Sequence, residues 1–156
     1  MRKYILSLTG GLILGQLTFA QERPNIIVIL ADDLGFSDLG CFGGEIQTPV
    51  LDEMAKEGLR MTQMYNSARS CPSRANLLTG LYPHQTGLGY MEGNRSTWPR
   101  GYSGFRSDSD NVTIAEVLKD AGYFTAMAGK WHLGNKSNPV QRGFQEYYGL
   151  LGGFNS

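Results

Sequence analysis

The chain has 156 residues with 14 basic and 14 acidic side chains, and its length predicts about one domain with a substantial core. The balanced charge gives no reason to expect a nucleic acid as partner. Its two cysteines, Cys41 and Cys71, could pair in an oxidising compartment, but two cysteines do not make a disulfide framework. We therefore predict two independent thiols.

The first twenty residues have the pattern of an export signal. Arg2 and Lys3 form a positive start, an apolar run covers residues 4–19, and residues 18–20 suit cleavage before Gln21. Glycines interrupt the run and no stop-transfer pattern follows, which argues against the alternative of a membrane anchor. We predict a signal peptide over 1–20, a mature domain over 21–156 with a net charge of −2, and an exported protein without a stable membrane anchor.

The mature sequence starts with a strand pattern. Residues 25–31 form a continuous apolar run rich in β-branched side chains, which is typical of a strand buried on both faces of a sheet. This pattern favours an α/β fold with a mostly parallel sheet, in which ligands bind at the carboxyl ends of the strands. Asp32 and Asp33 follow at that end.

Local signals predict a loop, a helix and a strand over residues 34–65. Glycines at several positions between 35 and 44 indicate the loop. Thr48 as N-cap, Pro49 in the first turn and Gly58 as a stop predict a helix over 49–57. Alternating apolar residues over 59–65 then predict a strand.

Residues 70–80, with the sequence SCPSRANLLTG, combine helix signals with a cation. Pro72 in the first turn and Gly80 as a stop predict a short helix over 72–79. Ser70 would lie just ahead of this helix, where unpaired backbone N–H groups favour an anion. Arg74 lies on the first turn, and its guanidinium could fold back toward the same point.

The pattern becomes irregular after this helix and regular again near residue 113. Residues 81–110 are rich in glycine, serine, proline and aromatic side chains, which predicts an irregular excursion near the site. Thr113 and Glu116 form a capping box for a helix that ends before Gly122. Residues 123–128 predict a second buried strand, which delivers Lys130 and His132 at its end.

Four side chains at the strand ends are candidates for chemistry, and each also has a structural interpretation. Asp32 and Asp33 could bind a divalent cation such as Ca²⁺ or Mg²⁺, or they could form a turn or a helix cap. Lys130 and His132 share one face if the strand continues, as a cation and a proton acceptor for anionic esters. The alternative is a solvated lysine and a hydrogen-bonded histidine. We interpret the other prominent side chains as structural: His84, Trp98 and Trp131.

Five stretches of the chain, taken in order, resemble the N-terminal part of a type I sulfatase. Type I sulfatases are the formylglycine-dependent family within the alkaline-phosphatase-like superfamily. The five stretches are residues 23–27, 31–35, 48–49, 70–80 and 129–134. The sulfatase signature reads Cys or Ser, any residue, Pro, Ser, Arg, then a run ending in Thr-Gly. Aligned on Pro72, the precursor position is Ser70 and the unspecified position is Cys71. The chain therefore resembles a serine-type sulfatase.

The resemblance implies a fold, a mechanism and a modified residue. The fold is an alkaline-phosphatase-like α/β sandwich with a mostly parallel central sheet. Ser70 would be oxidised to formylglycine and held as a geminal diol, of which one hydroxyl attacks sulfur while deprotonation of the other later expels sulfate. His132 matches the base for that last step, and Lys130 and Arg74 match cations that hold the diol. Asp32, Asp33 and the oxygen of residue 70 match ligands of a calcium ion, with Mg²⁺ as the less favoured metal.

The resemblance also implies partners and a compartment. Serine-type sulfatases resemble bacterial members that a radical-SAM enzyme matures, so we expect that enzyme as a partner in addition to a sulfated small-molecule or glycan substrate. A bacterial signal peptide agrees, and we expect the protein in the periplasm or secreted.

The length of the chain departs from the family pattern. The family's other metal ligands, its leaving-group acid and a sulfate-binding lysine lie beyond the counterpart of Ser156, so we expect a truncated N-terminal part of the catalytic domain. The leading hypothesis is a sulfuric ester hydrolase acting on aryl or carbohydrate sulfates. Two alternatives stay open: a phosphate or phosphonate ester hydrolase of the same superfamily, and an inactive fragment that only binds metal.

Overall fold

The computed structural model describes residues 23–92, 97, 99–106, 110–134 and 138–153. The chain divides into two units, residues 1–31 and 32–156, which are described separately. The predicted signal peptide, residues 1–20, lies outside the described residues. Among the described residues, no helix has the length and apolar character that a membrane span requires.

The described residues of the first unit, 23–31, have no regular secondary structure. The prediction of a buried strand over residues 25–31 is therefore wrong: Ile27 is 82% exposed, and the described strands pair only with each other. A strand needs a neighbour for its backbone N–H and C=O groups, which an apolar run alone does not provide. The predicted strand over 59–65 fails for the same reason, with Leu59 84% exposed.

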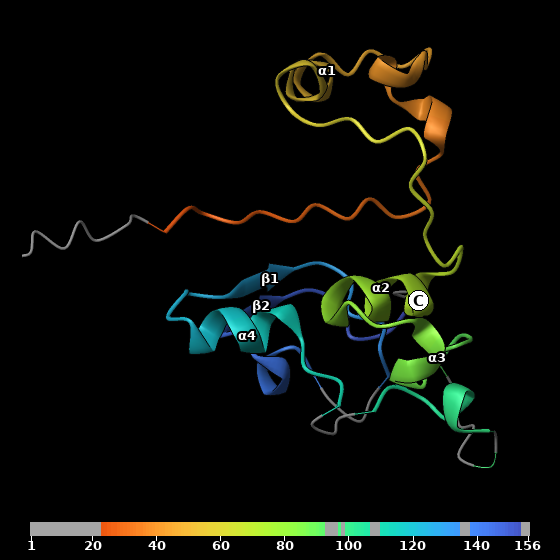
Figure 1. Ribbon diagram of the computed structural model, residues 1–156, viewed down its shortest axis with the longest axis vertical. Coiled ribbons are helices and arrows are strands. Elements are labelled where there is room, and N and C mark those ends of the chain that lie inside the picture. Colours follow the sequence, from red (N-terminus) through yellow and green to blue (C-terminus); the bar gives the residue numbers. More distant parts are fainter. Residues whose placement is uncertain (1–22, 93–96, 98, 107–109, 135–137, 154–156) are drawn as a thin grey trace, which may run out of the picture. The chain divides into compact units, whose positions relative to one another are not determined.

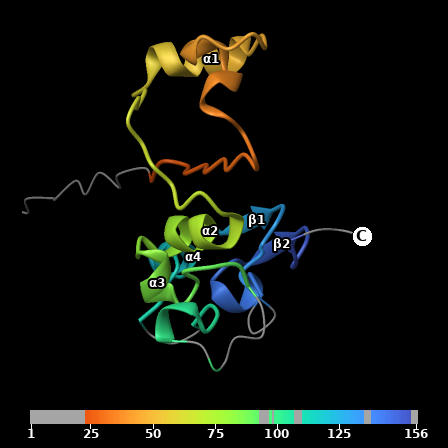
Figure 2. The same cartoon turned by 90° about the vertical axis from the view of Figure 1, so that its right-hand side faces the viewer.

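The second unit contains four α-helices, four short 3₁₀-helices and two strands in its described part (Figure 1). The helices are α1 (Pro49–Glu57), α2 (Ser70–Thr79), α3 (Pro83–Thr86) and α4 (Ile114–Asp120), and the strands are β1 (Ala126–Ala128) and β2 (Glu146–Tyr148). The 3₁₀-helices span Phe36–Asp38, Gly40–Phe42, Arg100–Tyr102 and Val140–Arg142. Helix α2 contacts both α3 and α4 (Figure 2).

Capping signals place four helix ends as predicted. Helix α1 has the predicted bounds, although the Thr48 hydroxyl donates to Asp52 and accepts no bond from the helix backbone. Helix α4 starts with the predicted capping box, in which Thr113 and Glu116 exchange side-chain and backbone hydrogen bonds. Gly80 ends α2 with a φ of 68°, in the left-handed region that favours glycine.

The start of α2 differs from the prediction. The helix begins at Ser70, and Ser70 is therefore its first residue, not a residue ahead of it. The extended residue Arg69 is the N-cap, and its carbonyl accepts a hydrogen bond from the Ser73 N–H at 3.0 Å. The N–H groups of the first helical turn have no partner within the helix, so a proline is tolerated at any position of that turn. Pro72 therefore marks the first turn without fixing its first residue.

Strands β1 and β2 pair in parallel, with Ala126 opposite Glu146, so the predicted parallel arrangement is confirmed. The predicted strand over 123–128 is too long and too deeply buried, because β1 covers only Ala126–Ala128 and its two alanines are exposed. A strand with one described partner has only part of its surface covered. The irregular stretch 81–110 is confirmed in its described part, apart from α3 and one 3₁₀ turn.

A single apolar cluster forms the core of the described second unit. We call this cluster the α2 core: Cys71, Ala75, Leu88, Phe105, Trp131 and Leu133. Trp131 is fully buried and meets the Phe105 ring edge to face, with ring centroids 6.4 Å apart. This confirms Trp131 as a packing residue, whereas Trp98 lies outside the described residues.

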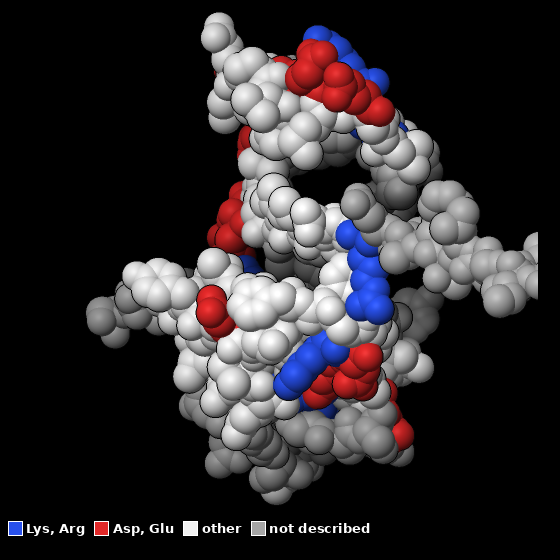
Figure 3. Space-filling model, turned by 90° about the vertical axis from the view of Figure 1, so that its left-hand side faces the viewer, with Lys and Arg blue, Asp and Glu red and all other residues white. Residues whose placement is uncertain are grey.

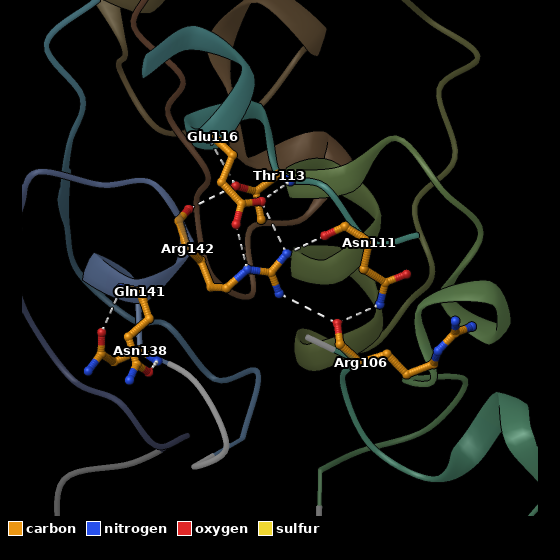
Figure 4. A network of polar contacts seen from close by, with 7 residues as sticks. All are labelled: Arg106, Asn111, Thr113, Glu116, Asn138, Gln141 and Arg142. Carbon is orange, nitrogen blue, oxygen red and sulfur yellow. Dashed lines mark hydrogen bonds and ion pairs between the residues drawn. The ribbon is translucent and has the colours of Figure 1, made fainter. Parts of the chain in front are cut away.

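A polar network joins α4 to the segment before β2 (Figure 4). The buried guanidinium of Arg142 donates to both carboxylate oxygens of Glu116, at 3.0 and 3.2 Å, and to the carbonyl of Asn111. Burial raises the pKa of Glu116, but the hydrogen bonds from Arg142 and Thr113 outweigh it, so the pKa lies below its ordinary value. The network therefore depends on an ionised Glu116.

On one face of the molecule, neither sign of charge dominates the described residues. On the face shown in Figure 3, basic and acidic side chains lie among larger uncharged areas. His84 lies on α3, where its Nε2 is 3.0 Å from the Tyr102 hydroxyl. This contact agrees with a structural interpretation of His84.

Candidate active site

The first turn of α2 points two neighbouring side chains in different directions. Ser70 is half-buried, and its Oγ lies 2.9 Å from Nδ1 of His132. Cys71 is 0% exposed and belongs to the α2 core, with its Sγ 4.0 Å from Sδ of Met91. Successive helical residues are turned by roughly 100°. The helix therefore directs the serine toward polar groups and the cysteine into apolar packing.

Burial also lowers the reactivity of the cysteine. It raises the pKa of the Cys71 thiol, which reduces the fraction of nucleophilic thiolate. Both cysteines are free thiols, as predicted, and Cys41 is only half-buried.

Arg74 folds back over the first turn of α2, as predicted. It lies four residues after Ser70 and so on the same face of the helix, and its Nε donates to Oγ of Ser70 at 3.3 Å. Its other nitrogens donate to the carbonyl of Lys130 at 2.7 Å and to Oδ1 of Asp32 at 3.3 Å. One buried guanidinium thus connects three residues that are far apart in the sequence.

Asp32 forms ion pairs with two basic side chains. Its Oδ2 accepts a hydrogen bond from Nζ of Lys130 at 2.8 Å, while its Oδ1 faces Arg74. The bond from Lys130, assisted by Arg74, holds the pKa of the Asp32 carboxyl below its ordinary value. An aspartate that follows the first apolar run thus pairs with a lysine that follows β1.

His132 reaches the site by a different route from the predicted one. Its φ is 55°, so the chain does not continue as a strand, and the same-face argument for Lys130 and His132 is wrong. The backbone instead turns between the buried residues Trp131 and Leu133, with the His132 N–H donating to the Leu151 carbonyl at 2.9 Å. This turn aims the imidazole at Ser70.

The surroundings of His132 favour a neutral ring. Burial lowers the pKa of the imidazole, and the positive charges of Lys130 and Arg74 lower it further, while the carboxylate of Glu92 acts in the opposite direction. A neutral imidazole has one unprotonated nitrogen, which can accept a proton from an oxygen at residue 70.

The aspartate pair provides part of a metal site. Asp33 is exposed and has a φ of 57°, a strained backbone geometry of the kind found at functional sites. Carboxylate oxygens are the donors that Ca²⁺ and Mg²⁺ prefer, but Ca²⁺ takes 6–8 oxygen ligands. Among the described residues, no group of three His, Cys, Asp or Glu side chains could hold a metal ion. The two aspartates fit a hard divalent cation in kind and supply only some of its ligands.

The sequence patterns missed one residue of this cluster. Oε1 of Glu92 lies 3.5 Å from Nε2 of His132, on the side of the ring away from Ser70. Glu92 belongs to the irregular stretch 81–110, where no period or motif marks it. Only the tertiary contact identifies it.

The sulfatase family model matches residues 24–156. An arylsulfatase of Klebsiella aerogenes is 50% identical over 135 residues, which cover 85% of this chain and 29% of that protein. Human steryl-sulfatase is 40% identical over 147 residues, covering 84% of this chain and 24% of the human protein.

Two solved structures are similar in fold and in sequence. The crystal structure of Ps i-CgsB has a TM-score of 0.73 and 41% identity, covering 85% of this chain and 29% of that chain. BT4656 was solved in complex with its substrate D-glucosamine-2-N,6-O-disulfate. It has a TM-score of 0.63 and 39% identity, and the match covers 81% of this chain and 23% of that chain.

This chain spans less than a third of the length of each of these relatives. Membership of their family implies a formylglycine and a divalent cation. Because the family match extends over residues 24–156 and includes every residue of the cluster around Ser70, the chain belongs to the sulfatase family.

Proposed function

We propose that this chain supplies the nucleophile side of a site that hydrolyses sulfuric esters of aryl or carbohydrate substrates. The observation that carries the proposal is the convergence of a base and a cation on one oxygen: Nδ1 of His132 and Nε of Arg74 lie 2.9 and 3.3 Å from Oγ of Ser70. The sulfated glucosamine bound by BT4656 supports a sulfated glycan as one substrate class.

The roles of the side chains follow from their contacts. A formylglycine at residue 70, hydrated to a diol, would supply one hydroxyl as nucleophile and a second whose deprotonation allows sulfate to leave. His132 accepts a proton from an oxygen at this position. Arg74 holds that oxygen in place, and its positive charge, with that of Lys130, stabilises the negative charge of a bound sulfate ester.

Asp32 and Asp33 would hold a divalent cation, together with an oxygen of residue 70. Such a cation would polarise a sulfate oxygen as a Lewis acid. Calcium suits two neighbouring carboxylates on an irregular backbone better than magnesium, which requires near-octahedral geometry. The pairing of Asp32 with Lys130 and Arg74 keeps its carboxyl ionised for this role.

The proposal also includes the enzyme that modifies Ser70 and the export of the chain. A serine at the precursor position implies a radical-SAM maturing enzyme as partner, and the pattern of residues 1–20 implies export to the bacterial periplasm or medium. Co-expression with such a maturing enzyme is therefore the preparation to use in any activity test.

Hydrolysis of an aryl sulfate by the matured chain tests the proposal. We expect turnover that is lost in Ser70→Ala and kept in Ser37→Ala, a matched loss of an exposed hydroxyl outside the signature. Activity that survives Ser70→Ala, or that is absent from the matured wild type, would contradict the proposal for this chain.

One contact also favours a phosphate ester hydrolase as second candidate. An unmodified Ser70 with a neutral His132 at 2.9 Å is already a nucleophile with its base, and a serine can turn over phosphate without oxidation. Matched aryl sulfate and aryl phosphate esters separate the two candidates. Preference for phosphate by chain made without the maturing enzyme would reverse our ranking, and calcium binding without hydrolysis of either ester would indicate a fragment that only binds metal.

A further inference from the structure

Glu92 contacts the one edge of the His132 ring that the reaction scheme leaves without a role. The imidazole is held between two groups, with Nδ1 2.9 Å from Oγ of Ser70 and Nε2 3.5 Å from Oε1 of Glu92. The second distance is within ion-pair range and slightly beyond the usual hydrogen-bond range. Catalytic hydrogen bonds are often long in the free protein and shorten when substrate binds.

The backbone of Glu92 is fixed against the start of α2. Its N–H donates to Sγ of Cys71 at 3.3 Å, and the preceding residue, Met91, packs on the same sulfur. One residue earlier, the Arg69 guanidinium lies 4.5 Å from the centroid of the Tyr90 ring. The position of the Glu92 carboxylate is therefore tied to the residues on either side of Ser70.

Two glycines leave the space that this arrangement needs. A Cβ on Gly153 would lie 2.5 Å from Nε2 of His132, and a Cβ on Gly134 would lie 3.3 Å from Oε2 of Glu92. Gly134 also has a φ of 91°, which side chains rarely adopt. Any larger residue at Gly153 would collide with the edge of the imidazole that faces Glu92.

We propose that Glu92 is a positioning residue whose carboxylate, which faces Nε2 of His132, keeps a proton on that nitrogen and orients the ring toward residue 70. An ionised carboxylate only accepts hydrogen bonds, so it favours the tautomer with the proton on the nitrogen that it faces. Nδ1 then presents its lone pair to the oxygen of residue 70. The inference rests on the proposed function of His132 as the base, and it explains why the buried ring has a carboxylate behind it.

The tautomer can be measured in the full chain without any activity. Long-range ¹H–¹⁵N correlation of the labelled 156-residue protein at neutral pH distinguishes the two ring nitrogens, and His84→Gln assigns the spectrum because the chain has only two histidines. We expect the Nε2–H form of His132 in the wild type. Glu92→Ala should shift the tautomer ratio toward Nδ1–H by about tenfold, the size of one charged hydrogen bond.

Three further variants make the result specific. Glu57→Ala, which removes an exposed glutamate at the end of α1, should leave the ratio unchanged. Glu92→Asp keeps the charge and should keep part of the preference for the Nε2–H form. Glu92→Gln keeps the shape of the side chain and provides the measurement if Glu92→Ala does not fold; it should weaken the preference because the charge is lost.

The outcomes separate this inference from the proposed function. A wild-type His132 protonated on Nδ1, or a ratio that neither Glu92→Ala nor Glu92→Gln changes, would overturn the role of Glu92. A ratio that depends on Glu92 in a chain that hydrolyses no sulfate ester would support the positioning role and count against the proposed function.

Discussion

Two regions of the chain are ordered by different forces. In residues 36–58 the Cys41 N–H donates to Oδ1 of Asp52 at 2.7 Å and the Gly40 N–H donates to Oγ1 of Thr48 at 2.9 Å. The rings of Phe36 and Phe42 also meet here, with centroids 4.4 Å apart, but Phe36 is 62% exposed. No residue of α1 is buried. Around α2, by contrast, six apolar side chains are buried in one cluster. A helix can therefore form with its apolar stripe exposed. By contrast, Ser70, Arg74 and His132 lie on or next to the packed elements of the α2 core.

Packing of neighbouring residues explains why the side chains of the candidate site are held in place in the second region. Ser70 is followed by the buried Cys71, and His132 lies between the buried Trp131 and Leu133. Close-packed neighbours restrict the rotamers and backbone of the residues between them. Polar contacts on an exposed segment restrict them far less, because water competes for each hydrogen bond.

The largest expected difference between the regions comes from truncating a core side chain. Trp131→Ala should lower the free energy of unfolding by about 3–5 kcal/mol, because it removes a fully buried aromatic ring. Met54→Ala, on α1 where Met54 is 59% exposed, should change it by less than about 0.5 kcal/mol. Urea denaturation measures both, and equal effects would contradict the distinction between the regions.

Removing a buried cation should have the next largest effect. Arg142→Ala leaves Glu116 and the Asn111 carbonyl without their donor and should destabilise the protein by about 3 kcal/mol. Arg60→Ala is the matched change at the first region, because it removes an exposed arginine just after residue 58 that donates to the Cys41 carbonyl. It should cost no more than about 1 kcal/mol, and a cost as large as that of Arg142→Ala would show that the polar segment is more tightly held than we infer.

Acid should lower the free energy of unfolding by protonating Glu116 of α4, which packs in the second region with Arg142. The pKa of Glu116 is lower in the folded chain than its ordinary value of 4.5, so the ionised form stabilises the fold. This contribution is fully present above pH 4.5 and is lost as the pH falls through the lower, folded pKa. Denaturation between pH 7 and pH 3 should therefore lose part of its pH dependence in Glu116→Gln; an unchanged profile would exclude Glu116 as a source.

Loss of a polar contact in the first region should cost less than loss of the core ring or of the buried cation. Asp52→Ala removes acceptors for Cys41 and Thr48 and should cost about 1 kcal/mol, confined to local order. Hydrogen exchange should increase in residues 36–58 and stay unchanged in residues 131–133. Faster exchange at His132 in this variant would mean that the two regions are coupled.

The sequence was sufficient for features that are encoded locally. Helix α1 and the capping box of α4 follow from a few neighbouring residues, and both are present as predicted. The strands over 25–31 and 59–65 were wrong because a strand depends on a partner that a local pattern cannot guarantee. The start of α2 was misplaced by the assumption that the helix begins at Pro72, whereas it begins at Ser70 with Arg69 as the N-cap.

The candidate site was predictable to the extent that its residues belong to motifs. Ser70, Arg74, Lys130 and His132 were selected in advance, and the structure brings them together with Asp32. The backbone path that brings them together was not predictable, because His132 has a left-handed φ where we expected the strand to continue. Glu92 could not be found at all, because its contact with His132 depends on an irregular segment returning to α2.

The central claim is that residue 70, and not its cysteine neighbour, is the group that is oxidised and reacts. Trypsin cleavage after Arg69 and Arg74 isolates residues 70–74, a peptide with Ser70, Cys71 and Ser73. Fragment-ion mass spectrometry of this peptide, from chain co-expressed with the maturing enzyme, measures the claim directly. We predict the loss of a pair of hydrogen atoms at Ser70 and an intact, alkylatable Cys71; an unmodified Ser70 in a chain with full sulfatase activity, or the modification at Cys71, would contradict it.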